Sequence, residues 1–482
     1  MACHAVSARA PEQLLEESMK VTRRSFIKSA AAVTAVFSIV PRHVLGGPKY
    51  VSPNDKVNVA IIGAGGQGIT NLKSLFHESD AQIVAVADPF EQTDLMGFYY
   101  KTMAGRSPVR AMIEKHHAEK NPGFRCADYE DFRVMLEKEK SIDAVLCATP
   151  DHLHAYVSIL SMQAGKHVFC EKPLTHNLRE VRQVAKVAKE TGAATQMGNI
   201  GHSRDGIRQT CEWIWDGAIG KVKEVHAWVG TRRWNPPLRG RPTETPEVPK
   251  GANWDLWLGP RPVRPYHPVY APVTWRDFWA FGGGGLGDFG CHDMDSAMWA
   301  LDLGTPESVE ARPGGEMNEE ITPHAEMVYY RFGQRGDKPP VSLTWYDGGM
   351  QPPVPEEMGP EGKLPNRGVL FVGEKGKMLC EGAGGSPRLV PIEKTRDYKK
   401  PEKTIPRSNG HHRDWLDACK GGKAASSNFE YAAKLTELTL LGILSLRTGK
   451  RIYWDAENMK ARGVPEADTI VMGDYRKGWE IV

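Results

Sequence analysis

The sequence lacks an apolar run long enough to cross a bilayer and a large excess of one charge sign. Its N-terminal apolar run, Ala30–Val40, is too short to span a membrane. The 482 residues include 62 Lys and Arg against 59 Asp and Glu, for a net charge of +3. So small a surplus of positive charge gives no electrostatic field strong enough to bind nucleic acid, and nucleic acid is excluded as a partner. A composition of 40% hydrophobic and 25% charged residues predicts a globular protein.

Paired cysteine motifs are also missing. The eight cysteines are scattered, without a C-x-x-C pair, which argues against a zinc ribbon or a redox dithiol. Cys147 and Cys170 lie in apolar runs typical of central strands, where a buried free thiol is the ordinary interpretation. Disulfides stay open as the less favoured alternative. No metal site is predicted.

The N-terminal segment has the pattern of an export signal. The basic stretch MKVTRRSFIKS, starting at Met19, precedes the apolar run, and Arg23 and Arg24 resemble a twin-arginine signal. We therefore expect residues 1–48 to be a signal segment and linker, with Met19 as the true translation start and an exported, periplasmic location. An amphipathic N-terminal helix in a cytoplasmic protein is the alternative. An uncleaved signal acting as an anchor is also open.

A nucleotide-binding pattern follows the signal. The β-branched run VNVAIIG leads directly into a G-x-G-x-x-G and then into apolar residues at helical spacing. Strand, glycines and helix in that order allow the backbone to approach a pyrophosphate at the helix N-terminus. The next strand, QIVAVAD, ends on an acidic residue that can hold both ribose hydroxyls and would repel a 2′-phosphate. NAD is predicted over NADP, bound in part by Gly63, Gly65, Gly66, Gln67, Gly68 and Asp88.

Strands and helices continue to alternate up to about residue 199, which predicts a doubly wound parallel sheet in a domain spanning 49–199. Ligands of such sheets bind at the carboxyl ends of the strands. Two strands end there with polar residues, which makes Thr149, His154, Glu171 and Lys172 candidates for the cofactor site. Lys172, held by a following proline, can donate to a substrate oxygen. An exposed loop charge is the alternative for Lys172, and a helix-start residue for His154.

The pattern changes in residues 200–482. Successive runs such as VKEVHAWVG, HAEMVYYRFG and GVLFVGEKG predict a largely antiparallel, open sheet in a second, α+β domain. Helical segments are predicted near 411–419 and 429–446. The fold class is therefore α/β: a Rossmann domain followed by an α+β domain.

An acid–histidine pair in the second domain predicts catalysis. Asp288 and His292 are four residues apart and would share one helical face, with Asp295 on a neighbouring position. Together with Lys172 they have the parts for hydride chemistry: His292 accepts the hydroxyl proton, Asp288 orients it, and the lysine steadies the oxygen. A helix-capping aspartate and a packed histidine are the alternative. Asp295 is a further candidate for binding substrate.

Tryptophan and proline are concentrated in a long loop, 231–282. Aromatic rings interleaved with Arg and Asp suit a pocket for a polyhydroxylated substrate, in which rings stack on C–H faces. Trp275 is the candidate substrate contact in this loop. The same rings would also pin the loop to its domain.

The motifs GAGGQG, ATPDHLHA, CEKP and the D-x-x-x-H of Asp288 to His292 together resemble the Gfo/Idh/MocA oxidoreductases, over about 57–455. The resemblance implies oxidation of a secondary alcohol on a sugar or cyclitol, a small-molecule carbohydrate partner and assembly into homodimers or homotetramers. The long loop and the export signal match a secreted branch of that family. An exported NAD enzyme would need tightly bound cofactor.

Some NAD-dependent glycosidases share this fold and oxidise the sugar transiently to loosen a glycosidic bond, so a glycoside hydrolase or lyase is the alternative function. Their usual second-domain motif is not obvious in GGGGLGDFGCH. A non-catalytic sugar-binding or assembly protein is a third, less favoured interpretation.

Overall fold

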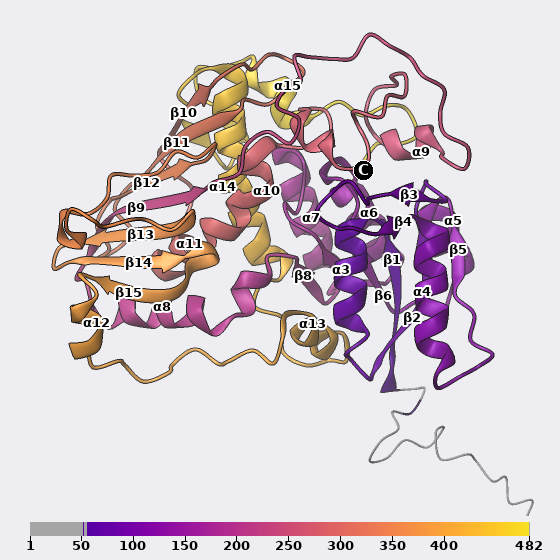
Figure 1. Cartoon of the computed structure of the whole chain (residues 1–482), viewed down its shortest axis with the longest axis horizontal. Coiled ribbons are helices and arrows are strands. Elements are labelled where there is room, and N and C mark those ends of the chain that lie inside the picture. Colours follow the sequence, from indigo (N-terminus) through magenta and orange to yellow (C-terminus); the bar gives the residue numbers. More distant parts are fainter. Residues whose placement is uncertain (1–51, 53–54, 482) are drawn as a thin grey trace, which may run out of the picture. The chain divides into compact units, whose positions relative to one another are not determined.

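The computed structural model describes residue 52 and residues 55–481, which form one compact unit from Asp55 onward. The predicted twin-arginine segment lies outside the described residues. Two sheets organise the described chain: a six-stranded sheet near its start and a seven-stranded sheet farther along, with helices between and around them (Figure 1). No helix in the described part is long and apolar enough to cross a membrane.

The first sheet is parallel throughout, in the order β5-β2-β1-β6-β7-β8, which confirms the predicted Rossmann-like sheet. Its strands are β1 (Val57–Ile62), β2 (Ala81–Ala87), β5 (Ala127–Tyr129), β6 (Ala144–Cys147), β7 (His167–Cys170) and β8 (Thr195–Met197). The associated helices are α3 (Gly66–Leu75), α4 (Arg106–Ala118), α5 (Phe132–Lys138), α6 (Asp151–Gln163) and α7 (Leu178–Thr191), and a short hairpin pairs β3 (Thr93–Asp94) with β4 (Met103–Ala104).

The second sheet has the order β10-β11-β12-β9-β13-β14-β15 and is antiparallel except for the β9–β12 pair. Its strands are β9 (Val222–Val229), β10 (Ser308–Gly314), β11 (Ala325–Phe332), β12 (Val341–Tyr346), β13 (Arg367–Gly373), β14 (Lys377–Glu381) and β15 (Gly385–Val390). The mostly antiparallel sheet that the sequence predicts is therefore present, with one parallel pair inside it.

Eight helices follow the first sheet in the described chain. They are α8 (Asp205–Trp215), α9 (Trp254–Leu258), α10 (Gly284–Asp293), α11 (Asp295–Leu301), α12 (Glu393–Asp397), α13 (His411–Cys419), α14 (Phe429–Thr448) and α15 (Ala467–Met472), with a small ladder of β16 (Trp454–Asp455) and β17 (Lys460–Ala461). Helix α14 is buried over most of its length and packs on α7, α10 and β10, so one hydrophobic core runs through both halves.

Local sequence explains where the longest helices begin and end. Asn428 caps α14 through the backbone N–H groups of Glu430 and Tyr431, and Gly449 ends the helix in the left-handed conformation. Helix α7 begins with a capping box formed by Asn177 and Glu180. These caps fix the position of α7 and α14, and their packed faces join the two halves.

The tryptophan-rich loop crosses back over the first sheet (Figure 1). Phe90 forms an isolated bridge with Ala252, and the N–H of Glu91 donates to the carbonyl of Gly251 over 2.7 Å. The loop has a small hydrophobic core of its own, built from rings that include Trp254 and Trp257. Its rings therefore pin the loop, and the loop forms a wall above the carboxyl ends of the parallel strands.

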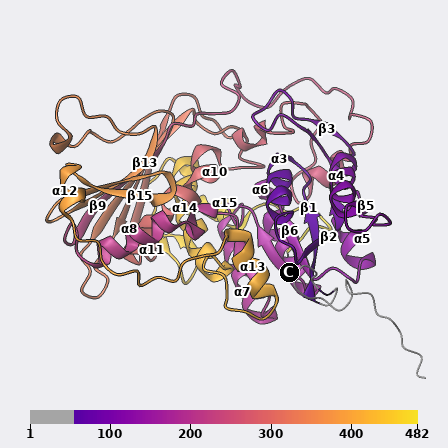
Figure 2. The same cartoon turned by 60° about the horizontal axis from the view of Figure 1, so that its bottom comes forward.

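Helix α13 also returns to the first sheet from late in the chain (Figure 2). Its Trp415 and Leu416 are fully buried in the same cluster as Val59 and Phe169 of the Rossmann strands. This segment lies beyond the predicted boundary at residue 199, yet it completes the core under the cofactor region.

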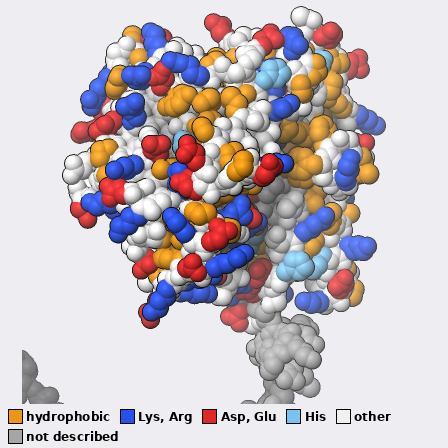
Figure 3. All heavy atoms as spheres, turned by 60° about the vertical axis from the view of Figure 1, so that its left-hand side comes forward, with side chains coloured by type: hydrophobic (Ala, Val, Ile, Leu, Met, Phe, Trp, Pro, Cys, Tyr) orange, Lys and Arg blue, Asp and Glu red, His pale blue; other side chains and the backbone are white. Residues whose placement is uncertain are grey.

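The outward face that carries the ends of the second sheet has mixed charge. Lys and Arg side chains alternate with Asp and Glu over it, and small hydrophobic areas lie between them (Figure 3). On this face, acidic and basic side chains are therefore interspersed, in keeping with their near-equal numbers in the composition.

Candidate active site

One cavity of about 660 Å³ contains most of the predicted site residues. The glycine-rich turn, the ends of β2, β6 and β7, one face of α10 and the tryptophan-rich loop all contribute to its wall. The predicted residues that line it are Gly63, Gly65, Gly66, Gln67, Asp88, Thr149, His154, Glu171, Lys172, Trp275, Asp288 and His292. Residues from both predicted domains therefore meet around a single space.

The glycines of the turn fit a dinucleotide for separate reasons. Gly63 has a φ of +92°, and a Cβ there would lie 2.5 Å from the carbonyl carbon of Ala148. A Cβ on Gly68 would lie 2.1 Å from the Gly63 oxygen, so these two glycines permit close packing of strand and helix. Gly65, which precedes α3, has no atom within 4 Å of its Cβ position. That opening, beside N–H groups that no side chain caps, suits a pyrophosphate.

Asp88 stands at the end of β2, where the ribose of NAD would be held. Its carboxylate accepts hydrogen bonds from the backbone N–H groups of Ala64 at 2.7 Å and Phe90 at 2.8 Å. Burial raises the pKa of Asp88 to about 6, against the lowering effect of these two bonds. The group is therefore mainly ionised at neutral pH, which disfavours a 2′-phosphate and fits NAD.

Glu171 ties the glycine-rich helix to the end of β7. Its Oε1 accepts from the side-chain amides of Gln67 at 3.0 Å and Asn71 at 2.8 Å. Asn71 in turn lies 3.2 Å from Nε2 of His412 on α13. Glu171 thus holds together the residues that line the cofactor region, because its carboxylate already accepts hydrogen bonds from protein donors.

Lys172 and Asp288 form the central ion pair of the cavity. Lys172 Nζ donates to Asp288 Oδ1 at 2.6 Å and to the Asp288 carbonyl at 3.1 Å, and both side chains are about 85% buried. Although burial opposes a charge on either group, the facing Asp288 carboxylate raises the pKa of Lys172 above its ordinary value. Lys172 therefore remains a cation and a hydrogen-bond donor at the strand end.

Arg276 is a second cation on the same carboxylate, and the sequence analysis did not single it out. Its Nε lies 3.4 Å from Asp288 Oδ1, and its guanidinium stacks over the Trp275 ring at 4.2 Å. Burial opposes ionisation of Asp288, but Lys172 and Arg276 together hold the pKa of that carboxyl well below its usual range. Arginines alternate with aromatic residues in the loop, and this pattern was a signal for a site in the sequence. It did not indicate which arginine would contact Asp288.

His292 lies one helical turn beyond Asp288 and lines the same cavity. No hydrogen bond joins His292 to Asp288 within residues 55–481; the aspartate contacts the two cations instead. Burial, with the positive charges of Lys172 and Arg367, lowers the pKa of His292 well below its ordinary value. The ring is therefore neutral at physiological pH, with one ring nitrogen lone pair not carrying a proton.

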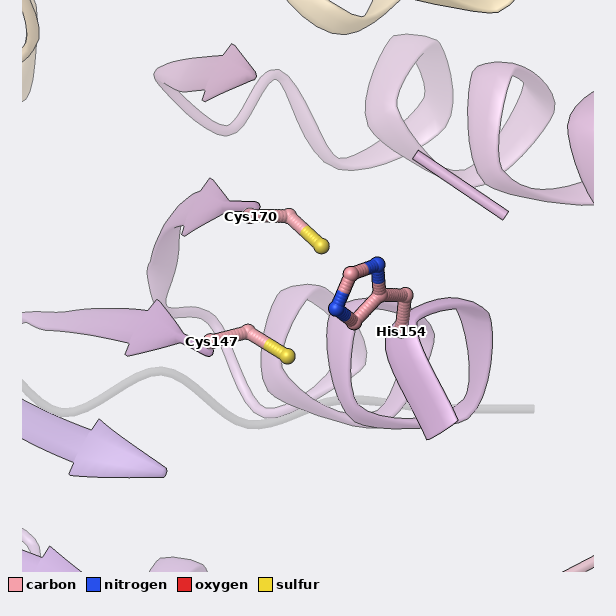
Figure 4. A group of neighbouring side chains, drawn as sticks. All are labelled: Cys147, His154 and Cys170. Atoms are coloured by element: carbon pink, nitrogen blue, oxygen red, sulfur yellow. The ribbon is translucent and has the colours of Figure 1, made fainter. Parts of the chain in front are cut away.

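His154 belongs to a buried cluster with two thiols. Cys147 and Cys170 sit at the paired ends of β6 and β7, and their sulfurs lie within 4.8 Å of a His154 ring nitrogen (Figure 4). Both ring nitrogens already face carbonyl oxygens, Nδ1 that of Pro173 at 2.6 Å and Nε2 that of Thr149 at 2.9 Å. Both His154 nitrogens, one of which a metal ion would need as its ligand, are therefore already in contact with backbone carbonyls. Both cysteines are free thiols.

Asp295 is placed apart from the cavity. It is 1% exposed, and its carboxylate contacts His202 Nδ1 at 3.0 Å, the Asn199 amide at 2.9 Å and the Tyr431 hydroxyl at 2.5 Å. It does not line the cavity that holds the other candidates. Its predicted contact with substrate stays a prediction, and its visible partners join α11 to α14.

Two family models match the chain. "Oxidoreductase family, NAD-binding Rossmann fold" matches residues 57–199, and "Oxidoreductase family, C-terminal alpha/beta domain" matches residues 224–333. Both models describe the Gfo/Idh/MocA proteins, and together they cover more than half of the sequence. The first of them identifies the parallel-sheet half as an NAD-binding Rossmann domain.

Curated relatives include proteins named as glycosyl hydrolase family 109. One from Stenotrophomonas maltophilia is 30% identical over 206 residues, which are 42% of this chain and 41% of the relative. One from Shewanella putrefaciens is 25% identical over 231 residues, 44% of this chain and 47% of the relative. The matched region thus spans under half the length of these relatives.

Solved structures share the fold over most of the chain. The WlbA dehydrogenase from Bordetella pertussis, in complex with NADH and UDP-GlcNAcA, has a TM-score of 0.54 at 18% identity and covers 83% of this chain and 99% of its own. The aldose-aldose oxidoreductase from Caulobacter crescentus has a TM-score of 0.52 at 16% identity, with coverages of 83% and 99%.

Proposed function

The chain belongs to the Gfo/Idh/MocA oxidoreductase family, and from that premise we propose that it oxidises a secondary hydroxyl of a sugar, glycoside or cyclitol with tightly held NAD. The observation that carries the proposal is the single cavity in which Lys172, Asp288 and His292 meet the glycine-rich turn. NAD, when bound, supplies the hydride acceptor, and the remaining chemistry falls to side chains of this protein.

Each of the three residues has a role that follows from its charge state. The Lys172 ammonium donates a hydrogen bond to the oxygen of the reacting hydroxyl. Asp288, ionised and paired with two cations, fixes the direction of that ammonium. The neutral His292 ring accepts the hydroxyl proton as the carbonyl forms.

The first experiment identifies the cofactor and then the activity. The protein is purified, denatured and analysed for released nucleotide by mass spectrometry, and sugars, glycosides and cyclitols are screened for reduction of the bound nucleotide. We expect stoichiometric NAD or NADH, and losses of at least about a hundredfold in Lys172→Ala and His292→Ala. Lys186→Ala, at an exposed helix position, is the control. Undiminished oxidation in both cavity variants would reject the site.

The second candidate function is cleavage of a glycosidic bond with NAD used catalytically. The specific observation in its favour is the set of relatives named as glycosyl hydrolase family 109. In this reaction the sugar is oxidised, the bond is broken by elimination, and the hydride is returned. Release of a free aglycone without net reduction of NAD distinguishes it from simple oxidation.

We also propose export by the twin-arginine route and assembly into a homodimer or homotetramer. The support for export is the sequence around Arg23 and Arg24, which lie outside the described residues. A protein exported after folding could carry its NAD with it, which explains why a signal and a nucleotide site share one chain. Replacing both arginines by lysine should retain the protein in the cytoplasm, as cell fractionation would reveal; an unchanged location would reject this route. Light scattering measures the assembly state.

A further inference from the structure

Asp151 is a buried carboxyl group with no role in the oxidation described above. It is the first residue of α6, directly after the strand-end Thr149 and Pro150, and it is 5% exposed. It lines the same cavity as Lys172 and Asp288, and it also borders a second cavity of about 300 Å³. The side chain therefore lies in the wall between the catalytic cavity and a second space.

No hydrogen bond from another residue of the described chain reaches the Asp151 carboxyl, and burial of the ionised form of such a group costs free energy. The charged groups that face it are Arg276 on the loop, Asp288 on α10 and Lys172 after β7. Burial is the strongest influence and, with the Asp288 charge, raises the pKa of Asp151 to about 8 against the opposing effect of the two cations. At neutral pH the group therefore holds a proton.

Neighbouring polar groups of the cavity have other contacts or roles. Lys172 donates to Asp288, His292 is a neutral base, and the Tyr100 hydroxyl accepts from that of Tyr99 at 2.6 Å. Asp151 lines this cavity beside Lys172 and Asp288 and holds a proton, so it has the position and the protonation state of an acid.

We propose that Asp151 is the general acid that protonates the departing oxygen when this protein cleaves a glycoside. The inference rests on the second candidate function. On the oxidised sugar, the ring carbon between the carbonyl and the anomeric carbon gives its proton to His292, which has already passed the hydroxyl proton to solvent. That C–H electron pair forms a double bond to the anomeric carbon, and the bond from that carbon to the glycosidic oxygen breaks. The oxygen keeps the electron pair and takes the proton of Asp151, so the aglycone leaves as an alcohol.

The cycle then closes without a further reactant except water. The Asp151 carboxylate removes a proton from water as the hydroxide adds to the anomeric carbon. The displaced double-bond electrons take the proton held by His292. The carbonyl carbon then takes back the hydride it gave up, and its oxygen regains a proton from solvent by way of His292, which restores the hydroxyl. The net result is hydrolysis of the glycoside, with both side chains returned to their starting protonation states.

The test compares two glycosides of one sugar, with p-nitrophenol and methanol as leaving groups, in the NAD-loaded enzyme. Nitrophenolate leaves without protonation, whereas methoxide does not. Asp151→Asn should therefore lose a hundredfold or more in kcat/KM on the methyl glycoside and less than tenfold on the aryl glycoside. Asp302→Asn, whose side chain is 83% exposed, is the matched control. Bound nucleotide and urea unfolding of each variant check that it folds.

The pH profile provides a second readout. Cleavage of the methyl glycoside should fall as the pH rises through about 8, because Asp151 then loses the proton that it must donate. Equal losses on both glycosides in Asp151→Asn, or full activity on the methyl glycoside, would overturn the assignment. A protein that oxidises sugars but cleaves no glycoside also overturns it and leaves the oxidation intact. Absence of any oxidation in the parent protein refutes the proposed function itself.

Discussion

At the scale of single residues, Arg276 decides how firmly the central ion pair is held. The carboxylate of Asp288 lies between Lys172 and Arg276, so removal of the arginine leaves one cation where there were two. We expect Arg276→Met to raise the pKa of Asp288 and to lower kcat/KM for oxidation by about ten- to a hundredfold, the equivalent of a lost charge-assisted hydrogen bond.

The measurement is kcat/KM as a function of pH, with Arg125→Met as the control because Arg125 is exposed and bonds only to the carbonyl of Phe124. Loss of activity should grow toward low pH, where the less stabilised Asp288 takes up a proton. An unchanged acidic limb in Arg276→Met would show that Lys172 alone fixes the carboxylate.

Residue types at motif positions were predictable, whereas pairings between distant segments were not. GAGGQG, CEKP and the D-x-x-x-H place Gly65, Lys172 and His292 through local spacing alone, and all three line one cavity. The partner of Asp288 was predicted from the same helix, but the aspartate contacts cations from a strand end and from a loop. Arg276 reaches the site only through tertiary packing of its loop, which no local pattern encodes, whereas Asp151 lies within the ATPDHLHA motif at a predicted strand end.

At the scale of elements, α10 begins on a pair of buried acids. Glu326 Oε1 accepts from the backbone N–H of Leu286 at 2.9 Å, and Asp347 Oδ1 accepts from the backbone N–H of Glu326 at 2.6 Å. Both residues are 1% exposed. Burial raises the pKa of Asp347 to about 7, and burial together with the facing Asp347 carboxyl raises the pKa of Glu326 well above its ordinary value.

This pair predicts a stability that declines with rising pH. Because the folded state holds protons that the unfolded chain releases near pH 4, the extra free energy of unfolding is fully present below that pH and is lost as the pH rises through 7. The slope is about 1.4 kcal/mol per pH unit for each proton so held. Urea unfolding between pH 5 and 8 measures it. Glu326→Gln, which retains an acceptor for Leu286, should flatten the slope, and an equal slope in both proteins would contradict this origin.

Elements with strong local signals were predictable and weak edge strands were not. The predicted helix at 411–419 coincides with α13, and the one at 429–446 falls two residues short of the end of α14. The sequence analysis did not name β10, whose last residues include Pro313 and Gly314, or the three-residue β5. Such strands form because a neighbour pairs with them, as β11 does with β10.

At the scale of the whole described chain, late segments complete the early domain. The tryptophan-rich loop forms one wall of the cavity, and α13 contributes His412 to its lining and Trp415 to the core of the first sheet. Segments from the second predicted domain, 200–482, therefore pack against the first, 49–199. Composition and periodicity carry no information about such returns, because the contacts join residues hundreds of positions apart.

The attachment of α13 can be tested through one ion cluster. Arg413 binds Asp80, which follows α3, through two hydrogen bonds of 2.6 and 3.0 Å, and Lys420 also contacts Asp80 at 2.5 Å. Asp80 is only 7% exposed, so removing the arginine leaves a buried carboxylate with a single cation. Arg413→Ala should cost about 2 kcal/mol in the free energy of unfolding, the size of a lost hydrogen bond to a charged group. It should also weaken NAD binding, because His412, the neighbour of Arg413, contacts Asn71 and through it Glu171.

A double-mutant cycle with Asp80→Ala measures the coupling energy of the Arg413–Asp80 pair, and bound nucleotide is measured in the same variants. A coupling energy well above 0.5 kcal/mol with a parallel loss of bound nucleotide means that α13 is part of the cofactor site. Coupling without any change in NAD affinity would limit α13 to a role in stability.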